Sequence, residues 1–210
     1  MTDTFTLIAG QRRAVADVLD TLNVEQWNTS SLCEGWTVRE VAAHLAMPLT
    51  TGMASIMWRM LKAKGNFDKV ADDYARTASS QTTSQLVAAI RDNAEHRFTP
   101  PGAGPEAPLT DLLVHGLDIG VPVDRRVPVP DEVPLVVLPF LFTKPARRGF
   151  VPESRVTGLR FAATDLDWST GDGPLVEGPA QSLALSLAGR PALVGDLTGD
   201  GVAEFTSRIS

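Results

Sequence analysis

Chemistry that depends on histidine or cysteine has few side chains to use in this chain. Its 210 residues include three histidines, His44, His96 and His115, and one cysteine, Cys33. A single cysteine cannot form an internal disulfide bond, and it excludes a cysteine-rich zinc site. Any histidine-based site must therefore use these three imidazoles.

Two of the histidines are spaced so that they could share a metal ion with a carboxylate. Asp111 and His115 are four residues apart in a segment of helical periodicity, which puts both side chains on one face of a helix. His44 lies on the apolar stripe of another predicted helix and should face the interior of a bundle. Two imidazoles and a carboxylate suit Zn²⁺ or a similar divalent ion, and leave a position open for water or substrate. Asp118, three residues after His115, is placed to orient that imidazole as a hydrogen-bond acceptor.

The spacing by itself leaves other interpretations open. An interior histidine is commonly a hydrogen-bonded core residue, and an aspartate four residues before a histidine also occurs by chance. Glu40 is a rival ligand because it precedes His44 by four residues, although helix capping explains it as well. Cys33, near the expected helix start at Thr37, could be a nucleophile or a small buried hydrophobic residue. His96 is expected at the surface, beside a proline-rich loop.

The first part of the chain has the hydrophobic periodicity of amphipathic helices. A Ser/Thr-x-x-Glu capping box from Thr37 to Glu40 marks the start of the helix that carries His44, and Pro48 predicts a kink within that helix. The prolines of residues 99–108 predict an extended loop. We expect helices at about residues 4–22, 37–64, 68–77, 83–96, 110–119 and 135–142.

The pattern changes after about residue 147. Leu159, Phe161 and Ala163 alternate with other residues as in a strand. We expect a turn at 168–174, a helix at 181–187 that ends at Gly189, and short strands at 192–194 and 202–205. The sequence therefore predicts an α+β chain, in which a helical bundle at residues 1–146 is followed by a small α/β domain at residues 147–210.

Charge and hydropathy exclude several classes of protein. The chain has 19 basic and 25 acidic side chains, and a net charge of −6 argues against binding to nucleic acid or to an anionic membrane. Its longest apolar run, residues 133–142, falls short of the ~18 residues of a membrane span and contains two prolines. No basic region precedes an apolar stretch at the N-terminus, so we expect no signal peptide and a cytoplasmic location.

Three parts of the chain resemble the mycothiol-dependent maleylpyruvate isomerase family, whose relatives are DinB-like metal-binding four-helix bundles. Residues 32–45, LCEGWTVREVAAHL, are similar to the family's second-helix motif, in which Gly-Trp-Thr/Ser-Val precedes the helix and a metal-ligand histidine follows. Residues 111–119, DLLVHGLDI, are similar to its second metal motif. Several stretches between residues 159 and 190 resemble the α/β domain, sterol-carrier-like in some descriptions, that follows the bundle.

The resemblance implies an up-down four-helix bundle in which His44, Asp111 and His115 hold a divalent ion. Zinc is the ion expected. The resemblance also implies mycothiol as the thiol cosubstrate and an electrophilic small molecule as substrate. The enzyme would be an S-transferase or a maleylpyruvate-type cis–trans isomerase. Arg190 would be catalytic and stabilise a carboxylate or enolate, although a solvated arginine beside a helix end is the alternative. The reactive thiol would come from the cosubstrate, so that Cys33 is not required.

The sequence departs from the family pattern at one ligand position. The family usually has glutamate where this chain has Asp111. Aspartate is one methylene shorter, so Asp111 is expected to bind through water or to shift the ion.

Two other functions compete with the enzyme hypothesis. One is a non-enzymatic protein that binds a small hydrophobic ligand in an apolar pocket. A large separation between His44 and His115 would favour it. The other is a metal-sensing regulatory protein, which would need a partner surface, and the scattered charges indicate none.

Overall fold

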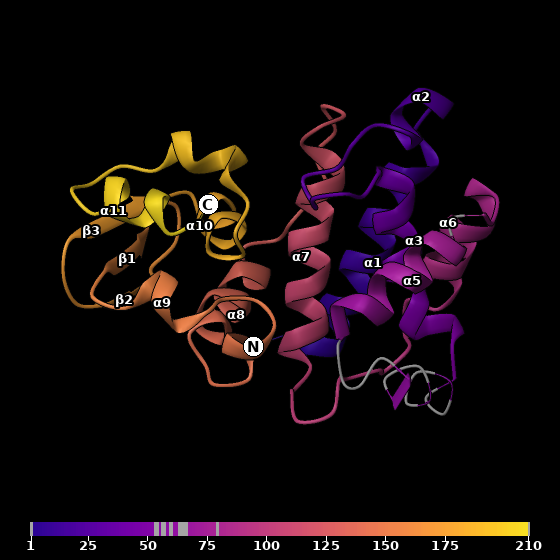
Figure 1. Ribbon diagram of the computed structural model, residues 1–210, viewed down its shortest axis with the longest axis horizontal. Helices are drawn as coiled ribbons and strands as arrows, with labels where there is room; N and C mark the ends of the chain where they lie inside the picture. Colours follow the sequence, from indigo (N-terminus) through magenta and orange to yellow (C-terminus); the bar gives the residue numbers. More distant parts are fainter. Residues whose placement is uncertain are drawn as a thin grey trace. The chain divides into compact units, whose positions relative to one another are not determined.

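The computed structural model describes residues 2–52, 55, 58, 61–62, 67–78 and 80–209. They form two compact units (Figure 1). One unit comprises residues 5–98 and 115–128, and the other comprises residues 99–114 and 129–210 with the residues up to Thr4. The helix α7 (Glu106–Gly120) contributes residues to both. The domain boundary predicted at residue 146 stays a prediction.

The first unit is helical. Helix α3 contacts both α5 and α6, and α1 is joined to α6 by ion pairs of Asp17 and Asp20 with Arg91. Gly116 of α7 faces Val15 of α1, because a Cβ atom built on Gly116 would lie 3.6 Å from the Val15 Cγ2. Besides α7, the helices whose bounds the structure describes in this unit are α1 (Thr4–Asp20), α2 (Val24–Trp27), α3 (Val38–Thr50), α5 (Phe67–Ala78) and α6 (Thr83–Asp92).

The start of α3 confirms the predicted capping box. The Thr37 hydroxyl oxygen accepts from the Glu40 backbone N–H, and the Glu40 carboxylate accepts from the Thr37 N–H at 2.7 Å. The predicted helix reaching residue 64 is wrong in its extent, because α3 ends at Thr50 and the backbone of Thr51 is extended. The kink expected at Pro48 stays a prediction. Pro48 has no N–H to donate to the His44 carbonyl, which weakens the last turns of the helix. The rest of the predicted segment lies largely outside the described residues.

Helix α7 begins earlier than predicted. The loop expected over residues 99–108 ends at Pro105, and Glu106 opens the helix with Pro108 in its first turn. Prolines are tolerated there because the first amides of a helix have no acceptor within it. The same rule explains α8 (Glu132–Leu141), which begins before the expected Leu135 and has Pro134 in its first turn.

The second unit contains a three-stranded sheet in the order β2-β1-β3 among the described residues. Strand β1 pairs antiparallel with β2 and parallel with β3, and its Phe161 stands opposite Thr170 and Val176. The Phe161 side chain is fully buried between the rings of Phe142 and Phe205. The elements around α8 are η1 (Ala146–Arg148), α9 (Glu153–Val156), β1 (Arg160–Ala163), β2 (Ser169–Gly171), β3 (Leu175–Gly178), α10 (Ala180–Leu187), η2 (Pro191–Asp196) and α11 (Val202–Ser207).

The α+β class is confirmed, as are the strand at 159–163 and the helix at 181–187, but three expectations for this unit are wrong. Ser169–Gly171 is a strand where a turn was expected, residues 192–194 lie in the 3-10 helix η2, and residues 202–205 lie in α11. An apolar run of three or four residues has no measurable period, so it does not distinguish a strand from a helical turn.

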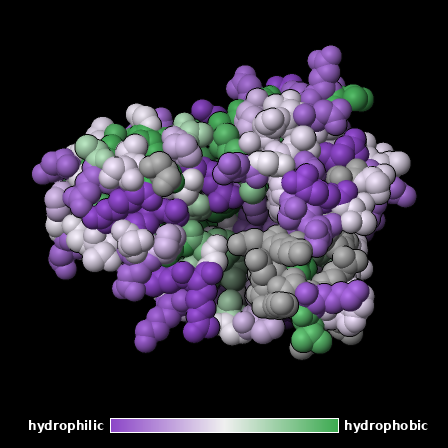
Figure 2. Space-filling view, viewed as in Figure 1, coloured by the Kyte–Doolittle hydropathy of each residue, from purple (hydrophilic) through white to green (hydrophobic). Residues whose placement is uncertain are grey.

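Apolar side chains are largely inside each unit, and hydrophilic residues spread over much of the face drawn in Figure 2. Within the described part of the chain, no helix has the length and apolar composition needed to cross a membrane.

Candidate metal centre

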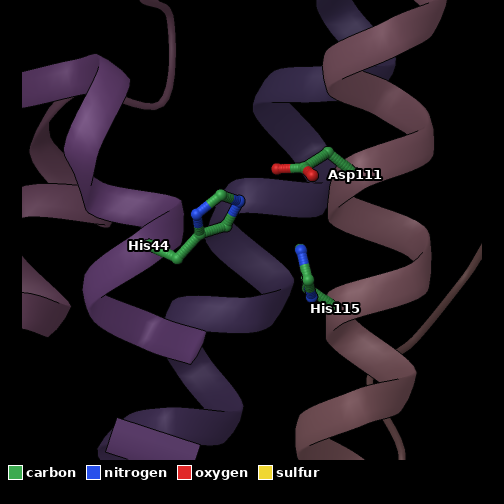
Figure 3. Close-up of side chains that lie close together, drawn as sticks. All are labelled: His44, Asp111 and His115. Atoms are coloured by element: carbon green, nitrogen blue, oxygen red, sulfur yellow. The ribbon is translucent and has the colours of Figure 1, made fainter. Parts of the chain in front are cut away.

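Helices α3 and α7 bring the three predicted ligands together. His44 projects from α3, while Asp111 and His115 project from consecutive turns of α7 (Figure 3). One donor atom from each residue lies within 4.8 Å of the other two. Both histidines are buried and Asp111 is half-buried. The helical spacing of Asp111 and His115 therefore has the predicted consequence, and Asp111 reaches the cluster despite its short side chain.

The separation of the donor atoms fits a common ion after small adjustments. Two ligand atoms about 2.1 Å from a tetrahedral ion stand about 3.4 Å apart. The observed upper limit of 4.8 Å exceeds that spacing by an amount that side-chain rotation can close. The set of two imidazoles and one carboxylate is a donor set of catalytic zinc sites, which keep a fourth position open.

Asp118 fixes the orientation of one ligand. The Nδ1 of His115 lies 2.9 Å from the Asp118 Oδ2, and the Asp118 side chain is fully buried. Because a carboxylate accepts and the imidazole must donate, the Nδ1 carries the proton. The other ring nitrogen, Nε2, then presents its lone pair toward Asp111 and His44 (Figure 3). This is the role predicted for Asp118 from its spacing.

The charges of the cluster also fit a divalent ion. Asp111 and Asp118 bring two carboxylates to a largely buried site. The two imidazoles of this site, His44 and His115, can be neutral and then do not balance that charge. Buried charge is costly unless an opposite charge balances it. A divalent cation would neutralise both carboxylates, and so the residues present fit such an ion.

Trp36 borders the centre, a role that the sequence did not indicate. Its ring centroid lies 5.2 Å from that of His44 and 6.4 Å from that of His115, nearly parallel to the second ring at 23°. The two imidazoles are themselves 4.9 Å apart. The signal for Trp36 was its place one residue before the capping box, which holds it beside the first turn of α3.

The other residues with possible chemistry lie elsewhere or have structural partners. Glu40 closes the capping box and is not part of the three-residue donor cluster. His96 is exposed, as predicted, and Cys33 is half-buried. Arg190 belongs to the second unit, where its Nη1 donates to the Ala188 carbonyl at 2.8 Å. Its catalytic role stays a prediction.

Comparisons with known proteins agree with the family indicated by the sequence motifs. Residues 8–99 match the family model of the mycothiol maleylpyruvate isomerase N-terminal domain. The crystal structure of the mycothiol-dependent maleylpyruvate isomerase is similar with a TM-score of 0.59 and 16% identity, over 94% of this chain and 91% of that chain. A histidine-to-alanine mutant of that enzyme gives a TM-score of 0.58 at the same identity and coverage. No curated protein matches.

At 16% identity the structural likeness establishes the fold, and the family model identifies the segment that carries His44. The resemblance predicted from the sequence is thereby confirmed: residues 8–99 match the model of the mycothiol maleylpyruvate isomerase N-terminal domain, and the chain has the fold of the solved isomerase.

Proposed function

We propose that this protein is a metal-dependent enzyme that uses mycothiol to attack an electrophilic small molecule. The observation that carries the proposal is the convergence of His44, Asp111 and His115 from two helices. The neighbouring structures named as mycothiol-dependent maleylpyruvate isomerases support the choice of thiol and of reaction class. The chain would act on its substrate as an isomerase or an S-transferase.

The three ligands would divide the work of holding the ion. His44 and His115 would each offer a neutral imidazole nitrogen, and Asp111 would offer a carboxylate oxygen. Zinc is the ion that such a set most often binds. When bound, the ion would supply the positive charge that keeps a thiol as its thiolate near neutral pH. Asp118 would hold His115 in the tautomer that coordination needs.

The thiol would act as a reversible nucleophile. Its sulfur would form a bond to an alkene carbon conjugated with a carbonyl group, while the alkene's π pair moves onto the carbonyl oxygen. Rotation about the resulting single bond, followed by expulsion of the thiolate, returns the thiol and leaves the trans alkene. Protonation of the adduct instead would give a stable S-conjugate. Isomerase and transferase therefore share the first step and differ in the fate of the adduct.

Arg190 is our candidate for the group that receives the developing negative charge. A guanidinium donates two parallel hydrogen bonds to a carboxylate and stabilises an enolate oxygen in the same way. The residue follows α10 and is half-buried, with its Nη1 on the Ala188 carbonyl.

The main alternative is a protein that binds a small hydrophobic ligand without catalysis. A binding protein of that kind does not need His44 and His115 close together, and a large separation would have favoured it. The centroids of the two rings lie 4.9 Å apart. The donor cluster therefore favours the enzyme. We also propose a cytoplasmic location, because the cytosol keeps low-molecular-weight thiols reduced.

Two measurements on the purified chain test the proposed function. Metal analysis after loading with Zn²⁺ should give about one ion per chain, and His44→Ala should lose it. With mycothiol present, the wild type should isomerise maleylpyruvate or conjugate an activated aryl halide, and His44→Ala should do neither. His96→Ala is the matched control, because His96 is an exposed histidine outside the cluster. Activity that ignores His44→Ala in a metal-free protein would contradict the proposal.

A further inference from the structure

Trp36 is held from several directions beside the two histidines. Its backbone N–H donates to the Cys33 carbonyl at 3.1 Å, and its own carbonyl accepts from the Ser31 N–H and hydroxyl, both at 2.9 Å. The same loop is tied to α7, where the Leu32 N–H donates to the Asp118 carbonyl at 3.2 Å. The loop that carries the indole therefore contacts the turn of α7 that orients His115.

A carboxylate on α5 fixes the far edge of the indole. The Trp36 Nε1–H donates to the Asp72 Oδ1 at 2.9 Å, across 36 positions of sequence. The Asp72 side chain is 40% exposed, so it holds the indole from the surface side. An indole N–H has a single direction for its hydrogen bond, and this bond therefore sets the rotation of the ring as well as its position.

Asp72 is in turn held by charge. The Arg76 Nε donates to both Asp72 oxygens at 2.9 and 3.0 Å, and the Arg76 Nη1 lies 3.8 Å from the Glu40 carboxylate. Arg76 first and the Trp36 N–H second lower the pKa of the Asp72 carboxyl. A chain of polar contacts thus runs from the capping box of α3 through α5 and back to the indole.

We infer that Trp36 is a positioning residue of the metal centre: its indole, oriented by the Asp72 carboxylate, fixes the ring planes of His44 and His115. This inference rests on the proposed function, because it gives the two imidazoles their role as ligands. Metal ligands depend on their surroundings for the orientation of their lone pairs. The hydrogen bond of His115 to Asp118 holds one edge of that ring. The indole packs beside both imidazoles, tilted by 50° to the ring of His44 and by 23° to that of His115.

The test uses the histidine ring resonances of the full chain. The protein is labelled with ¹³C-histidine and observed by NMR, both loaded with Zn²⁺ and after chelation. Only three histidines contribute signals, and the exposed His96 is the internal reference. Asp72→Ala removes the acceptor of the indole at a partly exposed position, so that the fold should persist. Asp72→Asn keeps an oxygen acceptor for the indole and loses the charge. Asp73→Ala removes a neighbouring exposed charge of the same helix.

Asp72→Ala should shift the ring signals of His44 and His115 and leave those of His96 in place. It should also weaken Zn²⁺ binding by about tenfold, the lower end of the effect of groups that orient metal ligands. Asp72→Asn and Asp73→Ala should keep the wild-type positions and affinity.

Two results would overturn the inference: unchanged His44 and His115 signals in Asp72→Ala, or equal shifts of all three histidines, which would indicate a general structural change. The ring signals of all three histidines can be measured in the chelated protein, without Zn²⁺. Failure of Zn²⁺ to bind the wild type would therefore count against the proposed function alone, while the ring signals still decide the role of Trp36.

Discussion

The His115 imidazole and the Asp118 carboxylate are joined across one turn of α7, with 2.9 Å between the Nδ1 and the Oδ2. The pair is buried, and the aspartate is fully inaccessible. Since the carboxylate can only accept, the bond selects the imidazole tautomer whose Nε2 faces Asp111 and His44. A residue outside the three-residue donor cluster thus decides which nitrogen of His115 faces that cluster.

Removal of this acceptor should weaken metal binding without removing a ligand. Asp118→Ala frees the ring of His115 to rotate and to change tautomer, and we expect Zn²⁺ affinity to fall by about 10- to 100-fold. The Zn²⁺ affinity of Asp118→Asn should lie between those of the wild type and Asp118→Ala, because the amide oxygen can still accept from the Nδ1. Competition with a chromophoric chelator measures the affinity. Asp92→Asn, an exposed aspartate at the end of α6, is the control and should bind Zn²⁺ as the wild type does.

The length of the acidic ligand can be tested at Asp111. Asp111→Ala removes one of three protein ligands and should reduce Zn²⁺ affinity by more than about 100-fold, beyond the effect of the groups that only orient ligands. Asp111→Glu restores the residue usual in the family and should retain binding. The Co²⁺-substituted protein reports the coordination through its visible absorption bands, which should change between aspartate and glutamate if Asp111 binds through water. Identical bands in the two proteins would argue for direct coordination in both.

Much of the candidate site could be predicted because it follows local rules. The i, i+4 spacing of Asp111 and His115 and the i, i+3 spacing of His115 and Asp118 are properties of one helix, and they persist in the folded chain. The capping box at Thr37 fixes where α3 begins and so which way His44 points. These features need no knowledge of how the helices pack.

The parts of the fold and of the site that could not be predicted depend on contacts between segments far apart in the sequence. The bond between Trp36 and Asp72 exists because α5 packs on α3, which no local spacing encodes. Strand β3 contains no alternation long enough to be recognised, yet it pairs with β1 over four residues. The segment from Val202 to Phe205 has the composition of a strand, but tertiary context makes it a helix with Phe205 buried against Phe161.

The stability contributed by the Asp72 carboxylate beside Trp36 should depend on pH in the acid range. The pKa of Asp72 is lowered first by Arg76 and then by the indole N–H, while Glu40 on α3 and Asp73 also face the Arg76 guanidinium. The folded pKa lies below the unfolded one, so the stabilisation by this carboxylate is fully present above the ordinary aspartate pKa of about 3.9. It is lost as the pH falls through the lowered pKa.

The indole ¹⁵N–¹H signal of Trp36 is the measurement for this prediction. It should stay in place from neutral pH down to about pH 4 and move only below that value. Asp72→Asn should show no such step, because it has no carboxylate to protonate. The indole signal of Trp168, which belongs to the other unit, provides the reference. A shift of the Trp36 signal between pH 5 and 7 would contradict the assignment of the step to Asp72.

The stability of the turn that precedes Trp36 should decrease when a single methyl group is added at Gly35. Gly35 has a φ of +76° between Cys33 and Trp36, and a Cβ atom there would meet nothing within 4 Å. Gly35→Ala should therefore cost about 1–2 kcal/mol of unfolding free energy through backbone strain alone. Gly35→Asn should recover most of it, since asparagine tolerates this conformation. Gly10→Ala is the matched control, equally uncrowded but inside α1, and it should stabilise the chain by about 0.5–1 kcal/mol. Urea denaturation measures all three, and equal effects at the two glycines would show that the φ of Gly35 carries no strain.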